Sequence, residues 1–194
     1  MMMTEKQKMS AGLIYDANND IALIEERRRC KEQCYDYNQL RPSATEQQQI
    51  LIRSLFGKTG TTFTITAPFW CDYGYNISIG ENFYANHNLV ILDGAHVTFG
   101  DNVFVAPDCG FYTAGHPLDA ERRNQGLEYA YPICVGNNVW FGGGVKVMPG
   151  VTIGNNVVIA AGSVVTNDIP DNVLAGGVPC RVIKNIEQTD KNRT

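Results

Sequence analysis

Histidine is scarce in this chain, and one of its three histidines occupies an unusual place. His116 falls in the segment Thr113-Ala114-Gly115-His116-Pro117, at the start of a polar stretch from about Gly115 to Tyr131. A loop that leaves a regular fold often carries function, and the chemistry that an imidazole could supply there is proton transfer near neutral pH. A histidine at a strand edge is otherwise an ordinary hydrogen-bonded residue, and the residue types alone leave both interpretations open.

Two polar residues interrupt apolar stretches earlier in the chain. Asn86 follows Ala85, and Asp93 follows the run from Leu89 to Leu92. A polar side chain in such a stretch is costly to bury unless it is hydrogen-bonded. The pattern therefore singles out both positions as polar residues that need a partner, although Asp93 also has a simpler interpretation as a corner residue.

The six cysteines form no recognisable site in the sequence. No two of them make a C-x-x-C pair, and they are scattered as Cys30, Cys34, Cys71, Cys109, Cys134 and Cys180. We therefore expect no metal site and no disulfide in a reducing compartment, and we interpret most cysteines as small buried residues. None has a partner arrangement that suggests covalent catalysis.

A six-residue period organises the elements that must position these groups. The residues that repeat at this interval are Val135, Phe141, Val147, Ile153, Ile159 and Val165, and Val139, Val145, Val151 and Val157 follow four positions later in each repeat. The period also appears at Ile79, Ala85 and Ile91, and two residues out of phase at Phe99, Val105 and Phe111. A helix would repeat at three and four and a half-buried strand at two, so these hexapeptide repeats predict a parallel β-helix.

The physics of stacking explains the residue types of the repeat. Each hexad is a short strand and a corner, and its aliphatic residue packs on its equivalents one coil above and below. Glycine and asparagine gather at the corners because they tolerate unusual backbone angles. A β-sandwich would also show alternating apolar residues, but it has no reason to keep a six-residue phase from Val135 to Val165.

The ends of the chain differ from the repeats and suggest the domain organisation. Residues 1–58 should form a helical cap, with helical spacing at Ile21, Ile24, Cys30, Cys34 and Tyr37 and a capping box at Ser43-Ala44-Thr45-Glu46 that opens a helix ending near Gly57. Residues 59–184 should form the β-helix, with the excursion at about 115–131, and the segment after Pro170 should leave the repeat. Residues 185–194 are polar and should fray.

Composition excludes several classes of protein. The chain has 194 residues, 44% of them hydrophobic, and a net charge of −4, which is typical of one globular domain and gives no sign of nucleic-acid or membrane binding. The residues from Met1 to Ser10 contain no apolar stretch that could act as a signal sequence. We therefore expect a cytoplasmic protein.

Several segments together resemble the maltose and galactoside O-acetyltransferases, a family of hexapeptide-repeat acyltransferases. The segments are Thr4-Glu5-Lys6, Met9-Ser10-Ala11-Gly12, Cys71-Asp72-Tyr73-Gly74-Tyr75-Asn76-Ile77, Asn82-Phe83-Tyr84-Ala85-Asn86, Gly115-His116-Pro117, Gly136-Asn137-Asn138-Val139-Trp140 and Gly177-Val178-Pro179-Cys180-Arg181. The resemblance covers nearly the whole chain, and it is more specific than the repeats alone.

The resemblance implies a fold, an assembly and a mechanism. It implies a left-handed β-helix, a homotrimer and acetyl-CoA bound between neighbouring subunits, with no metal required. His116 would be the general base that takes a proton from a sugar hydroxyl, and the backbone N–H of Gly143 would hold the oxyanion. Some relatives carry serine at the position of Gly143. Glycine in its place keeps the backbone N–H that would act as the donor.

The remaining site residues are also implied by the resemblance. The acceptor sugar would contact Asp16, Asp72, Tyr84, Asn86, Asp93 and Glu128. Coenzyme A would contact Trp140, Gly143, Ala161, Thr166, Asn167, Arg181 and Lys184, of which the arginine and lysine suit a phosphate. Many relatives have lysine in place of Asn167 and some have arginine in place of Lys184, so phosphate affinity could be weaker here. Trp140 could instead be a structural aromatic, and Arg181 and Lys184 could be solvated charges.

The function implied is acetyl-CoA-dependent O-acetylation of a sugar such as maltose, glucose or a galactoside. One alternative is an acetyltransferase for a non-sugar acceptor such as an antibiotic. Another is a β-helix carbonic anhydrase that uses three histidines on one metal, but His87 and His96 are nine residues apart and should point in different directions. Histidines could then meet only across subunits, and the acceptor itself is not readable from the sequence.

Overall fold

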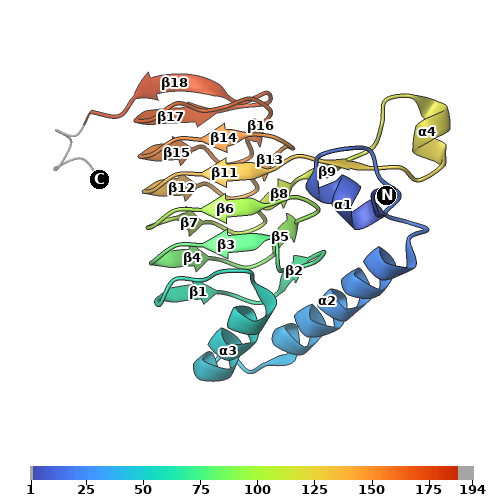
Figure 1. The fold of residues 1–194 in the computed structure, drawn as a ribbon. Coiled ribbons are helices and arrows are strands. Elements are labelled where there is room, and N and C mark those ends of the chain that lie inside the picture. The colour runs from blue at the N-terminus through green and yellow to red at the C-terminus, as the bar shows by residue number, and fades with distance from the viewer. Residues whose placement is uncertain (1, 188–194) are drawn as a thin grey trace.

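The structure is a computed structural model that describes residues 2–187. Figure 1 shows short strands stacked into a column, with helices against one end and one side. The N-terminal helices are α1 (Glu5–Ser10), α2 (Ile21–Gln39) and α3 (Thr45–Leu55). All three lie within the segment predicted as a cap, and β1 begins the column at Phe63.

The column has three faces, each a mostly parallel sheet. The β4 face contains β1 (Phe63–Ile65), β4 (Phe83–Ala85), β7 (Phe104–Val105), β12 (Val139–Phe141), β15 (Val157–Ile159), β17 (Val173–Gly176) and β18 (Arg181–Asn185). The β5 face contains β2 (Phe69–Cys71), β5 (Leu89–Leu92), β8 (Gly110–Tyr112), β13 (Lys146–Val147) and β16 (Val164–Val165). The β6 face contains β3 (Ile77–Ile79), β6 (Val97–Phe99), β11 (Ile133–Val135) and β14 (Thr152–Ile153). The predicted parallel β-helix is confirmed.

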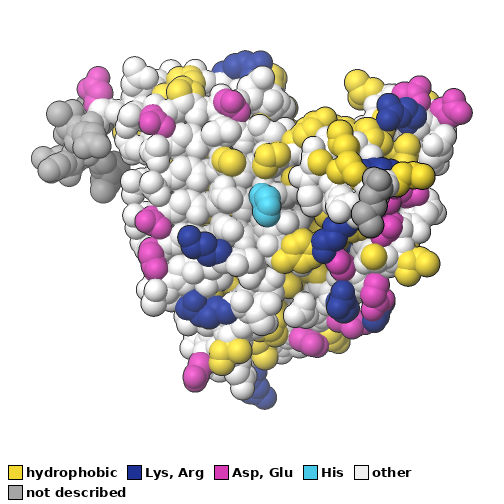
Figure 2. Space-filling model, viewed as in Figure 1, with side chains coloured by type: hydrophobic (Ala, Val, Ile, Leu, Met, Phe, Trp, Pro, Cys, Tyr) yellow, Lys and Arg dark blue, Asp and Glu magenta, His cyan; other side chains and the backbone are white. Residues whose placement is uncertain are grey.

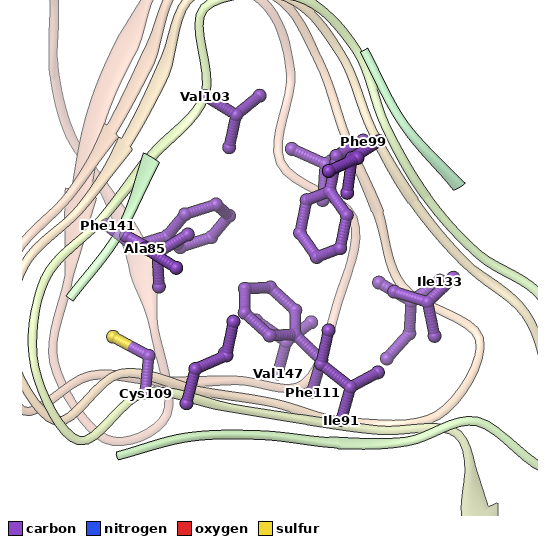
Figure 3. Packing of buried hydrophobic residues seen from close by; sticks show 14 of the residues in the cluster. Ala85, Ile91, Phe99, Val103, Cys109, Phe111, Ile133, Phe141 and Val147 are labelled. Atoms are coloured by element: carbon purple, nitrogen blue, oxygen red, sulfur yellow. The ribbon is translucent and has the colours of Figure 1, made fainter. Parts of the chain in front are cut away.

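The core is the aliphatic and aromatic ladder read from the sequence. Every residue of the hexad series from Val135 to Val165 is buried, as are the valines four positions later. Figure 3 shows side chains from the three faces pointing to a common centre, among them Ala85, Phe99 and Phe111. Phe111 lies edge to face with Phe99 at 4.9 Å and with Phe141 at 5.1 Å between ring centroids, so aromatic contacts continue from coil to coil.

Asparagines at one corner follow the same stacking. Asn102 has a φ of 56°, a left-handed conformation that asparagine tolerates better than most residues. Its Nδ2 donates to Oδ1 of Asn138 at 3.2 Å, and Nδ2 of Asn82 donates to Oδ1 of Asn102 at 2.9 Å. Stacked side-chain amides therefore support the turns that the backbone must make.

The phase slip in the hexad pattern has a structural cause. Tyr84 pairs with Phe104, twenty residues on, whereas Trp140 pairs with Val158, eighteen residues on. The two additional residues of the early coils lie at the corner between the β5 and β6 faces. This wide corner contains residues 72–76 between β2 and β3 and residues 93–96 between β5 and β6, and in the third coil the excursion leaves from it.

The excursion has its own short elements. It leaves through β9 (Ala114–Gly115), forms α4 (Ala120–Asn124) and returns through β10 (Tyr129–Ala130), which pairs antiparallel with β9. In Figure 1 it projects beside α1, away from the β4 face.

Three details of the sequence-based expectation are wrong. The capping box at Ser43 does not form: α3 begins after Ala44, which makes no side-chain cap bond, whereas Thr4 and Gln7 form a capping box on α1. Ile21 and Ile24 do not face the core, with 83% and 41% exposure, because Leu23 takes the buried position on α2.

The third correction concerns the C-terminal end of the column. Ala175, expected to leave the repeat, is buried in β17, which still pairs in parallel with β15. The chain then reverses into β18, which pairs antiparallel with β17 and extends to Asn185. Of the tail predicted to fray, residues 188–194 lie outside the described residues.

The cysteine prediction holds in part. Five of the six cysteines are buried and Cys134 is exposed. The sequence contains no sign that three of the buried cysteines, Cys30, Cys34 and Cys71, come together, with their Sγ atoms within 4.8 Å of one another. Sequence spacing missed this group because β2 and α2 meet only in the folded chain. None of the helices among residues 2–187 combines the length and apolar character needed to cross a bilayer.

Candidate active site

A small cleft of about 110 Å³ opens at the wide corner. Its lining combines the N-terminal segment, α2, two successive wide corners and both limbs of the excursion. We call it the corner cleft, and its residues are Tyr15, Arg27, Lys31, Asp72, Tyr73, Gly94, Ala114 and Glu128. It gathers two predicted acceptor residues, Asp72 and Glu128, from positions far apart in the sequence.

Hydrogen bonds fix the walls of the corner cleft. Tyr15 and Glu128 exchange two backbone hydrogen bonds of 3.0 Å, and the Tyr15 hydroxyl donates to Oε2 of Glu128 at 3.1 Å. On the opposite wall, Nη1 of Arg27 donates to the Tyr73 hydroxyl at 2.7 Å, and its Nη2 donates to the carbonyl of Ala17. The N-terminal segment thereby ties the returning limb of the excursion to the cap.

Burial controls the charge of two carboxyl groups at the corner. Burial raises the pKa of Asp72, while the positive charges of Lys31 and Arg27 oppose the shift. Asp93 is fully buried, and desolvation raises its pKa to about 7 even though its Oδ1 accepts the N–H groups of Asp72 and Tyr73. Oδ2 of Asp93 has no hydrogen-bond partner among the described residues. Asp93 therefore holds the corner backbone from below rather than lying on the surface of the cleft.

His116 lies on the outgoing limb of the excursion, close in sequence to the corner cleft. It follows β9 and lies two residues after Ala114, which lines the cleft. Its Nδ1 lies 2.9 Å from the carbonyl oxygen of Leu127. A carbonyl only accepts, so Nδ1 carries the proton and Nε2 of the exposed neutral ring keeps its lone pair.

Asp16 follows Tyr15 of the corner cleft, but its carboxylate is hydrogen-bonded to residues of its own turn. Its Oδ1 accepts the N–H groups of Asn18 and Asn19 at 3.1 and 3.0 Å. The side-chain amide of Asn18 in turn donates to the carbonyl of Gly126 at 2.7 Å. The arrangement suits a positioning role for Asp16 at the junction of the N-terminal segment and the excursion.

The predicted residues Tyr84, Asn86 and Trp140 lie elsewhere, on or beside the β4 face. Tyr84 and Trp140 flank Phe104 on adjacent strands. The side chain of Tyr84 is 38% exposed, that of Phe104 is 40% exposed and that of Trp140 is 54% exposed. Asn86 follows β4, and its Oδ1 accepts the N–H of His87. An exposed aromatic stripe thus runs along the column away from the excursion.

Gly143 and Ala161 occupy successive coils at the corner that follows the β4 face. The carbonyl of Gly143 accepts the N–H of Gly162, whereas the N–H of Gly143 has no acceptor among residues 2–187. A Cβ atom at Gly143 would meet only the carbonyl oxygen of Pro107, at 3.5 Å. The Gly143 amide is therefore a donor without an acceptor among residues 2–187, and Ala161 in the next coil is exposed.

The four residues predicted for the nucleotide end lie at the last coils and are exposed. Thr166 donates to Oδ1 of Asn167 at 3.0 Å, and Nη1 of Arg181 lies 3.5 Å from the same oxygen. Lys184 lies on β18 opposite Leu174. The structure thus brings Thr166, Asn167 and Arg181 together, with Lys184 on the terminal strand.

The three histidines do not form a metal site within one chain. Nδ1 of His87 donates to the carbonyl of Ala67, and Nδ1 of His116 donates to the carbonyl of Leu127. His96 lies between β5 and β6. Among the described residues, one group of potential metal ligands is close enough to share an ion. It consists of cysteines and contains no histidine.

Sequence reasoning missed Tyr15, Arg27, Lys31 and Tyr73. Arg27 carried a usable signal, because it lies on the stripe of α2 that also carries Leu23, Cys30 and Cys34, where the helix buries its side chains. A charged residue on a buried stripe needs a partner or a ligand. Tyr15 had no such signal, since its place depends on the pairing with Glu128.

Known families match this chain at both ends. A family model of the maltose acetyltransferase hexapeptide capping motif matches residues 8–60, and one of bacterial transferase hexapeptide repeats matches residues 135–167. A putative acetyltransferase of Saccharomyces cerevisiae is 57% identical over 183 residues, which are 94% of this chain and 93% of that protein.

Two solved structures extend the match to three dimensions. A maltose O-acetyltransferase from Clostridium difficile is 50% identical with a TM-score of 0.94, and the match covers 96% of this chain and 99% of that one. A galactoside acetyltransferase in complex with coenzyme A is 45% identical with a TM-score of 0.95, and the match covers 99% and 96%. With this identity over nearly the full length of both chains, the protein belongs to the hexapeptide-repeat acetyltransferases of the maltose and galactoside O-acetyltransferase family.

Proposed function

We propose that this protein transfers the acetyl group of acetyl-CoA to a hydroxyl group of a sugar, with His116 as the general base. The observation that carries the proposal is the exposed imidazole on the excursion, whose Nδ1 is bonded to the carbonyl of Leu127. That bond fixes the tautomer in which Nε2 is free to accept a proton. Proton removal by a positioned base typically accelerates such an attack by a factor of about 10² to 10⁴.

Polar groups of the corner cleft suit a polyhydroxylated acceptor. Asp72 and Glu128 offer carboxylate oxygens, and Arg27 and Lys31 offer donors on the opposite wall. Pairs of sugar hydroxyls both donate and accept, so a cleft that presents both kinds of group can bind them bidentately. In this proposal Asp16 and Asp93 position the backbone of the site and do not contact the acceptor. The proposal that the acceptor is a sugar rests on the family.

The donor half of the site would lie on the β4 face and the corner beyond it. Trp140 would pack against the pantetheine arm, Ala161 would offer backbone contacts, and Thr166, Asn167, Arg181 and Lys184 would face the nucleotide and its phosphates. The free N–H of Gly143 suits the oxyanion of the tetrahedral intermediate, because an amide donor needs no side chain. Tyr84 and Asn86, on the same side of the column, would complete the acceptor pocket.

A homotrimer would join the two halves. His116 belongs to the excursion beside the cap, whereas Trp140 and Asn86 belong to the β4 face, and Figure 1 shows these parts on opposite sides of the column. One chain alone therefore offers a base without an adjacent donor pocket. Packing the excursion of one subunit against the β4 face of the next would bring them together and would cover the exposed stripe of Tyr84, Phe104 and Trp140.

The test of the chemistry is release of free thiol from acetyl-CoA with a panel of sugars, corrected for the exposed Cys134. The matched variants are His116→Asn, whose amide can still donate to Leu127 but cannot act as a base, and His96→Asn as the control. We expect His116→Asn to retain its melting temperature and lose turnover, and His96→Asn to keep both. Release that is independent of every sugar, or unchanged in His116→Asn, would refute the proposal.

Subunit mixing tests the shared site separately. His116→Asn and Asn86→Ala subunits should each be inactive as pure proteins, and refolding them together should restore activity in mixed trimers. Sites built within one chain would show no restoration, and an active monomer on sedimentation would contradict the trimer directly.

A further inference from the structure

Three cysteine sulfurs meet where the cap joins the column. Cys30 and Cys34 lie one turn apart on α2, and Cys71 ends β2, against which α2 packs. Their exposed fractions are 2%, 0% and 3%. Sγ of Cys71 lies 3.4 Å from Sγ of Cys30 and 3.8 Å from Sγ of Cys34, and all three sulfurs are within 4.8 Å of one another.

These separations are close to those of sulfur ligands around one ion. A zinc–sulfur distance of about 2.3 Å puts two sulfurs about 3.8 Å apart in a tetrahedral site and about 4.0 Å apart in a trigonal one. Small side-chain adjustments would therefore suffice to close the three sulfurs on an ion. Thiolates are soft ligands that select Cu⁺ and Zn²⁺ over hard cations.

Metal binding would release the thiol protons of the cluster, because thiolates are the ligands. The affinity for the ion should therefore rise with pH.

The cluster lies beside an open cleft of about 550 Å³. Cys30, although only 2% exposed, is one of its lining residues, together with charged residues of both signs: Lys6, Glu26, Arg29, Glu32 and Asp36. Figure 2 shows acidic and basic side chains interspersed over α2. This cleft is the side from which an ion would enter the cluster.

We propose that Cys30, Cys34 and Cys71 form a three-sulfur site for one thiophilic d10 metal ion, Cu⁺ or Zn²⁺. Three sulfurs fit three-coordinate Cu⁺ directly, whereas Zn²⁺ would need a fourth ligand such as water, because the group contains no fourth protein ligand among residues 2–187. The ion would clip α2 to β2 immediately before Asp72 and Tyr73 of the corner cleft. Its role would be structural and independent of acetyl transfer.

The test uses the full-length protein with Cys134→Ser, which removes the exposed thiol. The protein is reduced with a thiol-free reductant, incubated anaerobically with Cu⁺ or with Cd²⁺ as a spectroscopic substitute for Zn²⁺, and separated from unbound metal by gel filtration. We expect one ion per chain, ultraviolet thiolate-to-metal charge transfer, protection of Cys30, Cys34 and Cys71 from alkylation, and a higher thermal midpoint.

Matched variants assign the sulfurs. Cys34→Ala and Cys71→Ala in this background should each lose the ion and the charge-transfer absorption, whereas Cys180→Ala, which removes an equally buried thiol outside the cluster, should retain them. If an alanine variant does not fold, Cys34→Ser and the alkylation pattern of the parent protein give the answer. No retained ion, equal retention without Cys34, or a Cys30–Cys71 disulfide formed in place of metal binding would overturn the proposal.

Discussion

Asp93 should make the stability of this protein depend on pH in a way that one substitution removes. Its side chain is fully buried and desolvation raises its pKa to about 7, whereas an aspartate in the unfolded chain has a pKa of about 3.9. The folded state therefore binds the proton more tightly than the unfolded state. Stability from this group is fully present below pH 4 and is lost as the pH rises through 7.

The size of the effect follows from the two pKa values. A difference of about 3 pKa units corresponds to a total of about 4 kcal/mol, of which about 2.5 kcal/mol is lost between pH 5 and pH 8. The variant Asp93→Asn keeps an oxygen that can accept the N–H groups of Asp72 and Tyr73 but cannot ionise. Its buried NH₂ group would cost a constant amount, about 1–3 kcal/mol if it finds no acceptor, which does not vary with pH.

The assay is urea unfolding of both proteins at pH 5 and pH 8 at one protein concentration, because any assembly makes stability concentration-dependent. The exposed histidines are common to both proteins, so their contribution cancels in the comparison. We expect the wild type to lose about 2.5 kcal/mol more than Asp93→Asn between the two pH values. Equal losses of unfolding free energy in the two proteins would show that Asp93 does not change protonation in the folded state. This result would refute the reasoning from desolvation.

Three further substitutions test the core, a corner and the corner cleft. Phe141→Ala should lose about 3–5 kcal/mol of unfolding free energy in urea, because it removes a ring buried against neighbouring coils, whereas Thr152→Ala on an outer surface should lose less than about 0.5 kcal/mol. Asn102→Ala should lose about 1–3 kcal/mol through its positive φ and its ladder bonds, and Asn102→Gly should lose less, since glycine adopts that φ freely; equal losses would contradict the role of φ. Arg27→Met should raise the KM for the acceptor about tenfold or more by removing a charged donor beside Tyr73, while the KM for acetyl-CoA stays unchanged; a rise in both would argue against a place in the acceptor half.

The repeats were readable from the sequence because each coil repeats one physical problem. A residue that points into the column must be apolar in every coil, so the hexad series from Val135 to Val165 predicted its own burial. Even the break in this regularity carried information. The shift of two residues between the run at Ile79 and the run at Phe99 marks the wide corner at which the corner cleft opens.

The cap was harder to read because its positions depend on the surface that it covers. Ile21 and Ile24 satisfied a helical period, yet α2 buries Leu23 and turns both isoleucines toward solvent. The sulfur cluster was missed for the same reason: residues 30 and 34 signal nothing until β2 supplies the third thiol. Repeating patterns in the sequence predict the coils of a solenoid well. They do not predict which face of a helix packs against it.

The candidate site combines these two kinds of structure. The regular part supplies the β4 face and the corner beyond it, where Gly143 lies and where the spacing to the β5 face is six residues in successive coils. The irregular part carries the proposed base, because His116 leaves the column at the wide corner and its ring is bonded to the carbonyl of Leu127 in the returning limb. Because a solenoid buries only what points inward, groups for chemistry must come from its outer surface, its corners and its loops. In the proposed trimer the site forms between subunits, because a neighbouring subunit can cover an exposed face that the chain itself leaves open.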